Sequence, residues 1–417
     1  MEKIILRRIS QVFENKKINN VSEKIIQELG RIKFNEKIKP GMQIAITVGS
    51  RGIDSLELII KTVIQEVKKY GASPFIIAAM GSHGGATVEG QLKILKSYGI
   101  TEEKMGAPVQ ASDEVIKLGK LKNGLPVFFN KIAYSADGII AVNRIKVHTA
   151  FKSDIESGLC KMLAVGLGGH KGASLVHSLG VKGLSSYMVE FAEVILQKAP
   201  ILCGIGILEN GYDKTYKLKA VDSYDFKKLD KTLLMECKKV LPRLPVLDID
   251  LLVVKEIGKN ISGTGMDTNI VGGITEFSQN NFSPPKIKGI VLLDLTPESH
   301  GNAHGVGLAT AITKKLYDKI DFQTTYTNSI TSGFLNKSRI PMVFSTEKEA
   351  FNTCLGVLGN LPTLKPRITI IKNTLKLDEM YVSESVWEEI KGRNNISSLD
   401  SWEELKFKGK GNFNLKI

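Results

Sequence analysis

Strand-length apolar runs alternate with helix-length amphipathic runs near the start of the chain, and this alternation constrains its fold most. Residues 43–48 (QIAITV) and 74–80 (PFIIAAM) are apolar runs of strand length. Residues 54–70 and 86–98 follow them and space their apolar side chains along one helical face. A strand–helix–strand–helix order predicts parallel strands covered by helices, so the sequence predicts an α/β fold.

A second α/β unit is predicted after a joint that contains Pro242 and Pro245. Beyond it we expect strands at 250–255, 288–294, 340–344 and 367–372, and helices at 305–318 and 346–358. A chain of 417 residues is long enough for two domains. We predict domains at 1–245 and 246–417, with mainly parallel sheets and the active site in the cleft between them. The last ~30 residues could pack back on the N-terminal domain.

The composition excludes several protein classes. A hydrophobic content of 42% with 24% charged residues is ordinary for a globular protein. No apolar run approaches the ~20 residues of a membrane span, and the N-terminus lacks the pattern of a signal peptide. The four cysteines are too scattered for a zinc ribbon, an iron–sulfur site or a disulfide framework. We therefore expect a cytoplasmic protein with no membrane partner.

The net charge of +14 is the unusual global property of the chain. Its lysines are dispersed along the sequence, many of them on predicted helix faces, with no dense basic tail and no interleaved aromatic residues. This distribution favours attraction of small anionic molecules over binding of nucleic acid.

The stretch from Val147 to His177 contains three of the six histidines of the protein. It also contains Lys161 within an apolar run (GLCKMLAVGL). Such a lysine either extends from a half-buried face to water or is held in a site, where loss of hydration lowers its pKa and makes it a nucleophile.

Polar side chains follow three predicted parallel strands. Ser50 and Arg51 follow the first strand, His83 follows the second, and His148 follows a later strand at 138–143. Open α/β sheets bind ligands beyond the carboxyl ends of their strands. An arginine there could hold a carboxylate, and two imidazoles could transfer protons.

Glycine-rich segments accompany these residues. Neither the segment after 80 nor Gly166-Leu-Gly-Gly-His-Lys-Gly has the spacing of a phosphate-binding loop or of a dinucleotide fingerprint. Each could present backbone N–H groups to a phosphate, or form a tight turn.

The ordered set GSR (49–51), MGSH (80–83), VH (147–148), SGLCK (157–161) and His177 resembles the nickel-dependent lactate racemase family. The resemblance covers most of residues 40–180 and extends only loosely into the C-terminal half. Enzymes of that family carry a nickel-pincer nucleotide.

The resemblance implies a role for each matching residue. Lys161 would be joined covalently to the cofactor, and His177 would be the nickel ligand. His83 and His148 would be the catalytic acid/base pair, and Arg51 would contact the substrate carboxylate. We add Ser50, Gly168 and Gly169 as expected cofactor-binding residues.

The chain departs from the family in its second half. Polar clusters follow two predicted strands there, at 256–267 and 297–304. We expect Lys259 and His300 to bind substrate, although both segments could also be ordinary loops. His170 and His304 receive no role. These departures support a 2-hydroxy acid larger or more polar than lactate, or a sugar acid, at least as well as lactate itself.

The sequence therefore predicts a 2-hydroxy acid racemase or epimerase that works by reversible hydride transfer to a lysine-tethered nickel-pincer nucleotide. Alternatives are another enzyme with the same cofactor, a zinc hydrolase, and a non-catalytic protein that binds a nucleotide or an anion. Expected partners are an anionic 2-hydroxy acid and the proteins that make the cofactor, and we expect a monomer or a homodimer.

Overall fold

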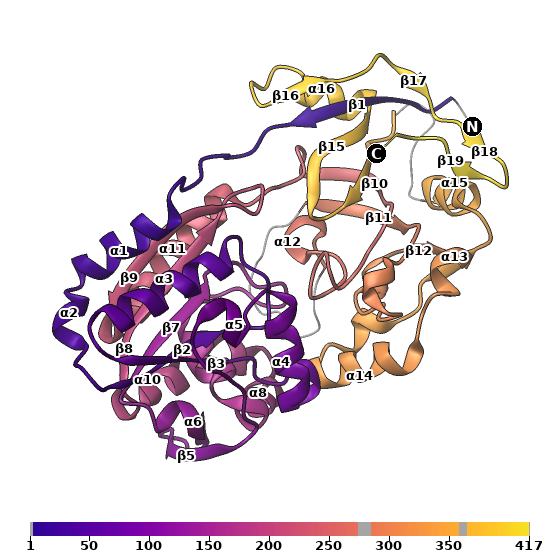
Figure 1. Cartoon of the computed structure of the whole chain (residues 1–417). Helices are drawn as coiled ribbons and strands as arrows, with labels where there is room; N and C mark the ends of the chain where they lie inside the picture. The colour runs from indigo at the N-terminus through magenta and orange to yellow at the C-terminus, as the bar shows by residue number, and fades with distance from the viewer. Residues whose placement is uncertain (1–2, 274–284, 358–364, 417) are drawn as a thin grey trace. The chain divides into compact units, whose positions relative to one another are not determined.

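A computed structural model describes residues 3–273, 285–357 and 365–416. The chain forms two compact units: Glu14–Leu241, and a second unit that joins Met1–Phe13 to Pro242–Ile417 (Figure 1). This division differs from the domain boundaries predicted from the sequence. Residues 1–13 belong to the C-terminal unit, which resumes at Pro242 instead of at residue 246.

The N-terminal unit is built on a six-stranded sheet. Its strands, in spatial order, are β4 (Val109–Gln110), β3 (Ser73–Ala78), β2 (Gln43–Val48), β7 (Gly138–Arg144), β8 (Ile201–Glu209) and β9 (Thr215–Asp222). All neighbours are parallel except β8 and β9, which form an antiparallel hairpin. The mainly parallel sheet predicted from the strand–helix alternation is confirmed.

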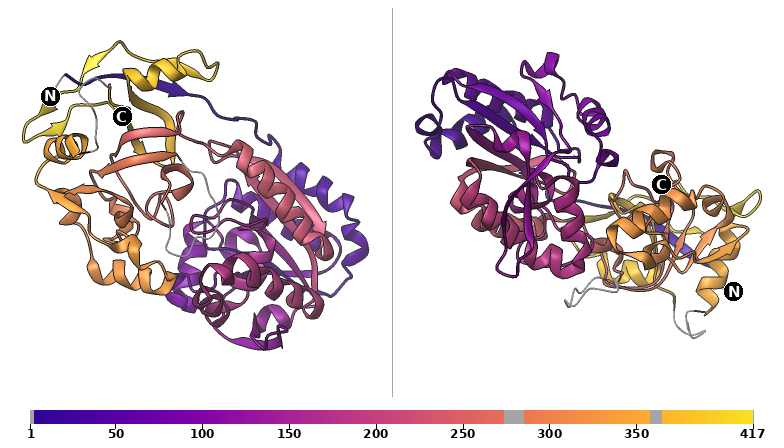
Figure 2. Two further views of the ribbon diagram at one scale, coloured as in Figure 1. Left: turned by 180° about the vertical axis from the view of Figure 1, so that it is seen from behind. Right: turned by 90° about the horizontal axis from the view of Figure 1, so that it is seen from below.

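Helices cover both faces of this sheet because successive side chains of the buried strands point to opposite sides. Ile140 and Val142 of β7 belong to one apolar cluster, while Ile139 and Ala141 belong to another. The first cluster includes side chains of α1 (Val21–Arg31), α3 (Leu56–Lys69) and α4 (Val88–Ser97). The second includes side chains of α10 (Met188–Lys198) and α11 (Phe226–Val240), as the two views of Figure 2 help to follow.

A small hairpin, β5 (Val115–Lys120) with β6 (Pro126–Asn130), and several short helices complete this unit. The short helices are α2 (Phe34–Lys37), α5 (Glu102–Met105), α6 (Lys131–Tyr134), α7 (Leu159–Lys161), α8 (Gly169–Ser178) and α9 (Gly180–Lys182).

The C-terminal unit has a mixed sheet. Its central path is β13 (Met342–Phe344), β12 (Ala311–Thr313), β11 (Lys286–Leu292), β10 (Asp248–Val254), β14 (Ile368–Asn373), β15 (Lys376–Ser383), β1 (Ile5–Gln11) and β16 (Ile396–Ser398). The strands from β13 to β14 are parallel, and the remaining pairs are antiparallel. The expectation of a mainly parallel sheet thus holds for about half of this sheet.

The helices of this unit are short. They are α12 (Thr268–Val271), α13 (Lys314–Tyr317), α14 (Phe322–Ser332), α15 (Glu347–Val357) and α16 (Glu384–Ile390). The helix predicted at 305–318 is wrong over most of its length. Within it lies β12, whose β-branched run is buried between β11 and β13, because tertiary pairing overrides a short helical pattern.

The C-terminal residues return to the N-terminal strand. β16 and β17 (Glu403–Glu404) pair with β1, and β18 (Phe407–Lys408) pairs with β19 (Asn412–Phe413). These strands belong to the C-terminal unit. The expectation that the last residues pack back on the N-terminal domain remains a prediction. Within the part of the chain described here, no helix is both long and apolar enough to cross a bilayer.

Candidate active site

The carboxyl ends of β2, β3 and β7 carry the residues that the sequence singled out. Ser50 follows β2 and His83 follows β3, and the Ser50 hydroxyl is hydrogen-bonded to His83 Nδ1. The backbone carbonyl of Ser50 accepts a hydrogen bond of 2.9 Å from the Tyr98 hydroxyl. Because β2 and β3 are parallel neighbours, both strand ends open at the same edge of the sheet.

Arg51 stands at this edge as a cation. It makes no hydrogen bond or ion pair with any residue that the structure describes. Its side chain keeps contact with solvent, but the surrounding protein removes part of its hydration and lowers its pKa, and Arg144 adds repulsion. A guanidinium stays charged at neutral pH despite such a shift, so Arg51 is available to an anionic ligand.

His148 is held through its backbone and one ring nitrogen. Its backbone N–H donates to Glu156 Oε2 at 2.7 Å, and its Nδ1 accepts from the backbone N–H of Ala150 at 3.1 Å. Its ring lies 4.5 Å from the Phe151 ring, centroid to centroid. The acceptor role of Nδ1 places the proton of the neutral ring on Nε2.

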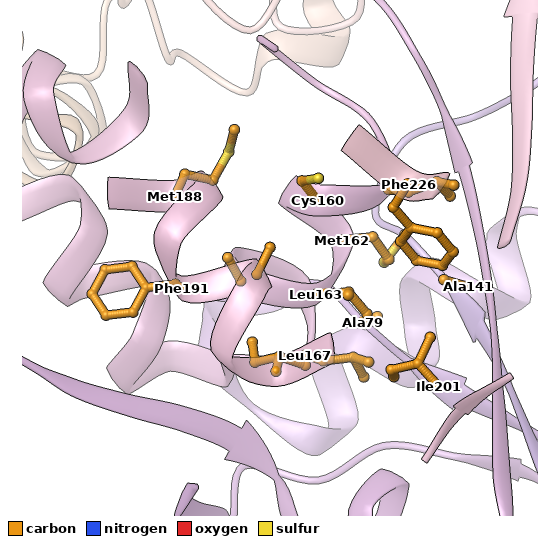
Figure 3. Packing of buried hydrophobic residues seen from close by; sticks show 14 of the residues in the cluster. Ala79, Ala141, Cys160, Met162, Leu163, Leu167, Met188, Phe191, Ile201 and Phe226 are labelled. Atoms are coloured by element: carbon orange, nitrogen blue, oxygen red, sulfur yellow. The ribbon is translucent and has the colours of Figure 1, made fainter. Parts of the chain in front are cut away.

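Lys161 lies at a break in the helical geometry. It ends α7 and precedes a π-helical turn, Met162–Gly166, in which the Leu167 N–H donates to the Met162 carbonyl at 2.8 Å. Turns of this type interrupt α-helices often at functional sites. The apolar neighbours Cys160, Met162 and Leu163 are buried in the core of the unit (Figure 3).

A buried carboxylate fixes the start of this helix. Asp230, on α11, accepts hydrogen bonds of 2.9 Å from the backbone N–H groups of both Leu159 and Cys160. A Cβ at Gly158 would approach Asp230 Oδ1 to 2.2 Å, so only glycine fits there. Burial raises the pKa of Asp230 to about 6, against the opposing effect of these hydrogen bonds.

The ammonium group of Lys161 has an uncommon environment. Burial, followed by repulsion from Lys146 and Arg51, lowers the pKa of Lys161 from 10.5 to about 7. The side chain is half-buried, and it has no hydrogen bond or ion pair with any residue that the structure describes. At neutral pH a large fraction of Lys161 is the free amine, which is the nucleophilic form.

His177, on α8, lies within electrostatic reach of Lys161. Burial, with a smaller contribution from Lys161, lowers the pKa of His177 to about 4. Its Nδ1 is buried and has no hydrogen-bond partner among the described residues. A neutral imidazole with an unsatisfied nitrogen is a suitable ligand for a transition metal.

Gly168 and Gly169 are buried at the start of α8. A Cβ would approach the Ala164 carbonyl oxygen to 2.3 Å at Gly168 and Val115 Cγ1 to 2.8 Å at Gly169. Close packing accounts for both glycines, and their cofactor-binding role remains a prediction.

The remaining residues of the sequence prediction are His170, Lys259 and His300. His170 is exposed, 3.5 Å from the Ser174 hydroxyl through Nδ1. Lys259 and His300 belong to the C-terminal unit. Lys259 Nζ donates to the Gly263 carbonyl at 2.5 Å, and His300 is exposed with a left-handed backbone (φ 47°). Their substrate-binding roles and the expected cleft between domains remain predictions.

Sequence reasoning missed Glu156 and Asp230. Glu156 is fully buried, and it bonds the backbone of His148 and forms an ion pair of 2.9 Å with Lys238. Asp230 interrupts the buried apolar face of α11. An acidic residue on an apolar helix face was the available signal.

The described residues contain no group of three or more histidine, cysteine or acidic side chains that could hold a metal ion. The zinc hydrolase alternative, which needs such a set, gains no support from this part of the chain. A metal bound near His177 would need further ligands from a cofactor.

Comparisons with known proteins agree with this picture. Residues 3–181 match the family model described as the lactate racemase N-terminal domain. Among solved structures, the chain is similar to the lactate racemase apoprotein from Thermoanaerobacterium thermosaccharolyticum, with a TM-score of 0.53 and 13% identity over 90% of this chain and 94% of that one. At that identity the likeness concerns the fold alone. The comparison with curated proteins gives no match.

Proposed function

We propose that this chain, whose residues 3–181 belong to the lactate racemase N-terminal domain family, is an isomerase that racemises or epimerises a 2-hydroxy acid. The proposal rests chiefly on one observation. Lys161 has a pKa of about 7 and no hydrogen-bond partner among the described residues, and it lies near the unsatisfied Nδ1 of His177.

The residues around Lys161 fit a nickel-pincer nucleotide. An amine that is uncharged near neutral pH can be joined to an acyl-type carbon, and the product is neutral and suits an apolar environment. His177 can supply an imidazole nitrogen to nickel, which accepts nitrogen and soft sulfur ligands together. When bound, this cofactor supplies a carbon that accepts and returns a hydride.

Arg51 is proposed to bind the substrate carboxylate. Its guanidinium is free of acidic partners within the described residues and can form a bidentate pair with a carboxylate. A substrate held in this way keeps its C2 carbon in one place while the two faces of that carbon react in turn.

His83 and His148 are proposed to take and return the hydroxyl proton. Racemisation needs a proton acceptor for each enantiomer, hence two imidazoles. The Ala150 N–H bond at His148 Nδ1 favours the neutral form with its proton on Nε2. In this state Nε2 is a donor. It can accept a proton only in the other neutral tautomer, whose proton lies on Nδ1 and which requires the bond from the Ala150 N–H to break. The Ser50 hydroxyl holds the ring of His83 through its Nδ1.

The first experiment tests attachment of the cofactor. The full chain is produced together with cofactor-making proteins, and its peptides are weighed and its nickel is measured. We expect added mass on the Lys161 peptide, and loss of that mass in Lys161→Arg but not in the neighbouring control Lys171→Arg. An unmodified Lys161 with no nickel in the loaded preparation would contradict the proposal and favour the non-catalytic alternative.

The second experiment tests the reaction and its substrate. Loaded protein is assayed for racemisation over a panel of 2-hydroxy acids that runs from lactate to sugar acids. His83→Asn and His148→Asn should each reduce turnover by about 100-fold or more with the cofactor still attached, while His170→Asn, on an exposed histidine, should retain it. Racemisation that survives either of the first two substitutions contradicts the two-base assignment. Modified Lys161 without racemisation of any panel member favours another reaction with the same cofactor.

A further inference from the structure

The C-terminal unit buries a lysine whose ammonium group lacks a hydrogen-bond partner. Lys337, in a short 3₁₀ turn (Leu335–Ser338), is only 3% exposed. Its Nζ is buried and donates a hydrogen bond to no acceptor among the described residues. An ammonium group removed from water without an acceptor destabilises the folded state, so buried lysines without a bonded partner are rare.

His304 lies beside this lysine. It is 2% exposed, and its Nδ1 lies 2.7 Å from the Ser329 hydroxyl. That hydroxyl is hydrogen-bonded to Ser338, the neighbour of Lys337 in sequence. Burial, followed by Lys259 and then Lys337, lowers the pKa of His304 to about 3. Both lysines therefore lie close enough to His304 to disfavour its protonation. The imidazole of His304 is neutral at pH 7.

Lys259 connects this group to half-buried amides. Its Nζ donates to the Gly263 carbonyl at 2.5 Å and to Asn328 Oδ1 at 2.6 Å. Asn302 Nδ2 donates to the same Asn328 oxygen at 3.2 Å. Lys259, Asn302 and Asn328 are half-buried, so this side of the group reaches solvent.

No bonded carboxylate compensates Lys337 within the described residues. Asp267 raises its pKa slightly, but burial dominates and lowers it to about 8. Asp267 Oδ1 instead accepts two hydrogen bonds from Asn269, of 2.8 Å and 2.7 Å, at the start of α12. The Phe334 ring, with its centroid 4.7 Å from Nζ, gives only partial compensation, since a cation–π contact replaces no hydrogen bond.

We propose that Lys259, His304 and Lys337, which we call the cationic cluster, bind an oxyanion, either a carboxylate or a phosphate group of a small molecule. Two ammonium groups supply the charge, and a buried imidazole supplies a neutral hydrogen-bonding group. The half-buried side with Asn302 and Asn328 admits the ligand. The Lys337 side chain, held by no hydrogen bond, can turn to the ligand without breaking one.

The inference shares Lys259 with the expected substrate-binding residues, but it needs neither Lys161 nor a cofactor, so its failure and that of the proposed racemase chemistry can be told apart. The test therefore uses the full chain without cofactor. Thermal unfolding and titration calorimetry are carried out with three probes: inorganic phosphate, lactate, and malate as a dicarboxylate. Phosphate and the two carboxylates distinguish the sources of the oxyanion.

Lys337→Met is the main variant, Lys259→Met the second, and Lys314→Met, on an exposed lysine of the same unit, the matched control. We expect at least one probe to raise the midpoint of the wild type and of the control. Affinity for that probe should fall by about tenfold or more in Lys337→Met and Lys259→Met, as for loss of a charge-assisted hydrogen bond.

A second readout separates binding from a structural role. Without anion, Lys337→Met should unfold at a higher temperature than the wild type, because it removes a buried charge that has no acceptor. If Lys337→Met fails to fold, loss of affinity in Lys259→Met carries the test. The proposal is overturned if none of the probes binds at millimolar concentration, or if affinity is unchanged in the variants that fold.

Discussion

Burial and the nearby cations Lys146 and Arg51 lower the pKa of Lys161. The pKa of its amine is about 7 in the folded protein and 10.5 in an exposed chain. Between these values the unfolded state binds more protons, so the free energy of unfolding rises with pH across this window. Below pH 7 both states are protonated, and the full unfavourable contribution of Lys161 is present. The same environment that makes the amine reactive thus destabilises the fold at neutral pH.

The first prediction concerns this amine. An amine-reactive label at pH 7 to 8 should modify Lys161 ahead of exposed lysines such as Lys171, with a rate that rises through about pH 7 and then levels. Lys161→Met should raise the free energy of unfolding by about 1 to 3 kcal/mol at pH 6, and by less at pH 10. Peptide mass mapping and denaturant unfolding measure the two effects. Equal labelling of Lys161 and Lys171 at pH 7 would refute the lowered pKa.

The second prediction concerns Glu156, which holds the loop of His148. Glu156→Gln keeps the shape of the side chain but weakens its bonds to the His148 N–H and to Lys238. We expect turnover of the cofactor-loaded protein to fall on the order of tenfold or more, because His148, the proposed acid/base group, becomes less well placed. The cofactor mass on Lys161 should be unchanged. Glu236→Gln, on a surface ion pair with Lys217, is the control and should retain turnover.

At the scale of elements, the π-helical turn after Lys161 depends on an element distant in sequence. Asp230 of α11 accepts the N–H groups that begin α7, and Gly81 after β3 donates its N–H to the Gly166 carbonyl at 3.1 Å. A Cβ at Gly81 would approach the Val165 carbonyl oxygen to 2.9 Å, at a positive φ of 59°. Asp230 of α11 therefore holds the chain just before the turn, and Gly81, after β3, holds the end of the turn.

The third prediction tests the anchor at Asp230. Asparagine can accept only one of the two N–H bonds well, so Asp230→Asn should lower the free energy of unfolding by about 1 to 3 kcal/mol at pH 7. The pKa of Asp230 is raised to about 6, so its contribution to stability is largest in acid and decreases as the pH rises through 6. The deficit of the variant should therefore be larger at pH 5 than at pH 7. Denaturant unfolding at both pH values measures this.

Asp154→Asn is the control for that measurement, since Asp154 forms an exposed ion pair with Lys231. It should change the free energy of unfolding by less than about 0.5 kcal/mol. Equal effects of the two substitutions would show that Asp230 does not anchor the turn.

At the scale of the whole molecule, the first strand of the chain completes the sheet of the last unit. β1 lies between β15 and β16, and Leu6 and Ile9 are fully buried in the C-terminal unit. The chain then passes into the N-terminal unit and returns at Pro242. The stability of the C-terminal unit is consequently tied to residues at the opposite end of the sequence.

The fourth prediction follows from the place of β1 in the C-terminal sheet. Leu6→Ala should lower the stability of the C-terminal unit by about 2 to 5 kcal/mol, the range for large-to-small changes in a core. Hydrogen exchange should become faster in β10, β14 and β15, with little change in β2, β3 and β7. Ile5→Ala, at a neighbouring position that is 44% exposed, is the matched control. Faster exchange in the N-terminal sheet alone would contradict this assignment.

The sequence by itself determined the α/β class, three strands of the N-terminal sheet (β2, β3 and β7) and the polar residues that follow them. Apolar period and turn residues are local properties, and parallel strands bring their carboxyl ends to one edge, so Ser50, Arg51, His83 and His148 could be assigned to strand ends in advance. It also marked Lys161, because a lysine within an apolar run is visible without any tertiary information.

Only the tertiary structure decided which distant groups act on these residues. Contacts between segments far apart in the chain place β1 in the C-terminal sheet and β12 between its neighbours, and they bury Lys337. Such contacts also join Glu156 to Lys238 and Asp230 to the start of α7. Sequence periodicity reports which face of an element is apolar but not which element covers it. The pKa values and hydrogen bonds of the site depend on which elements pack against it, and so the sequence alone did not predict them.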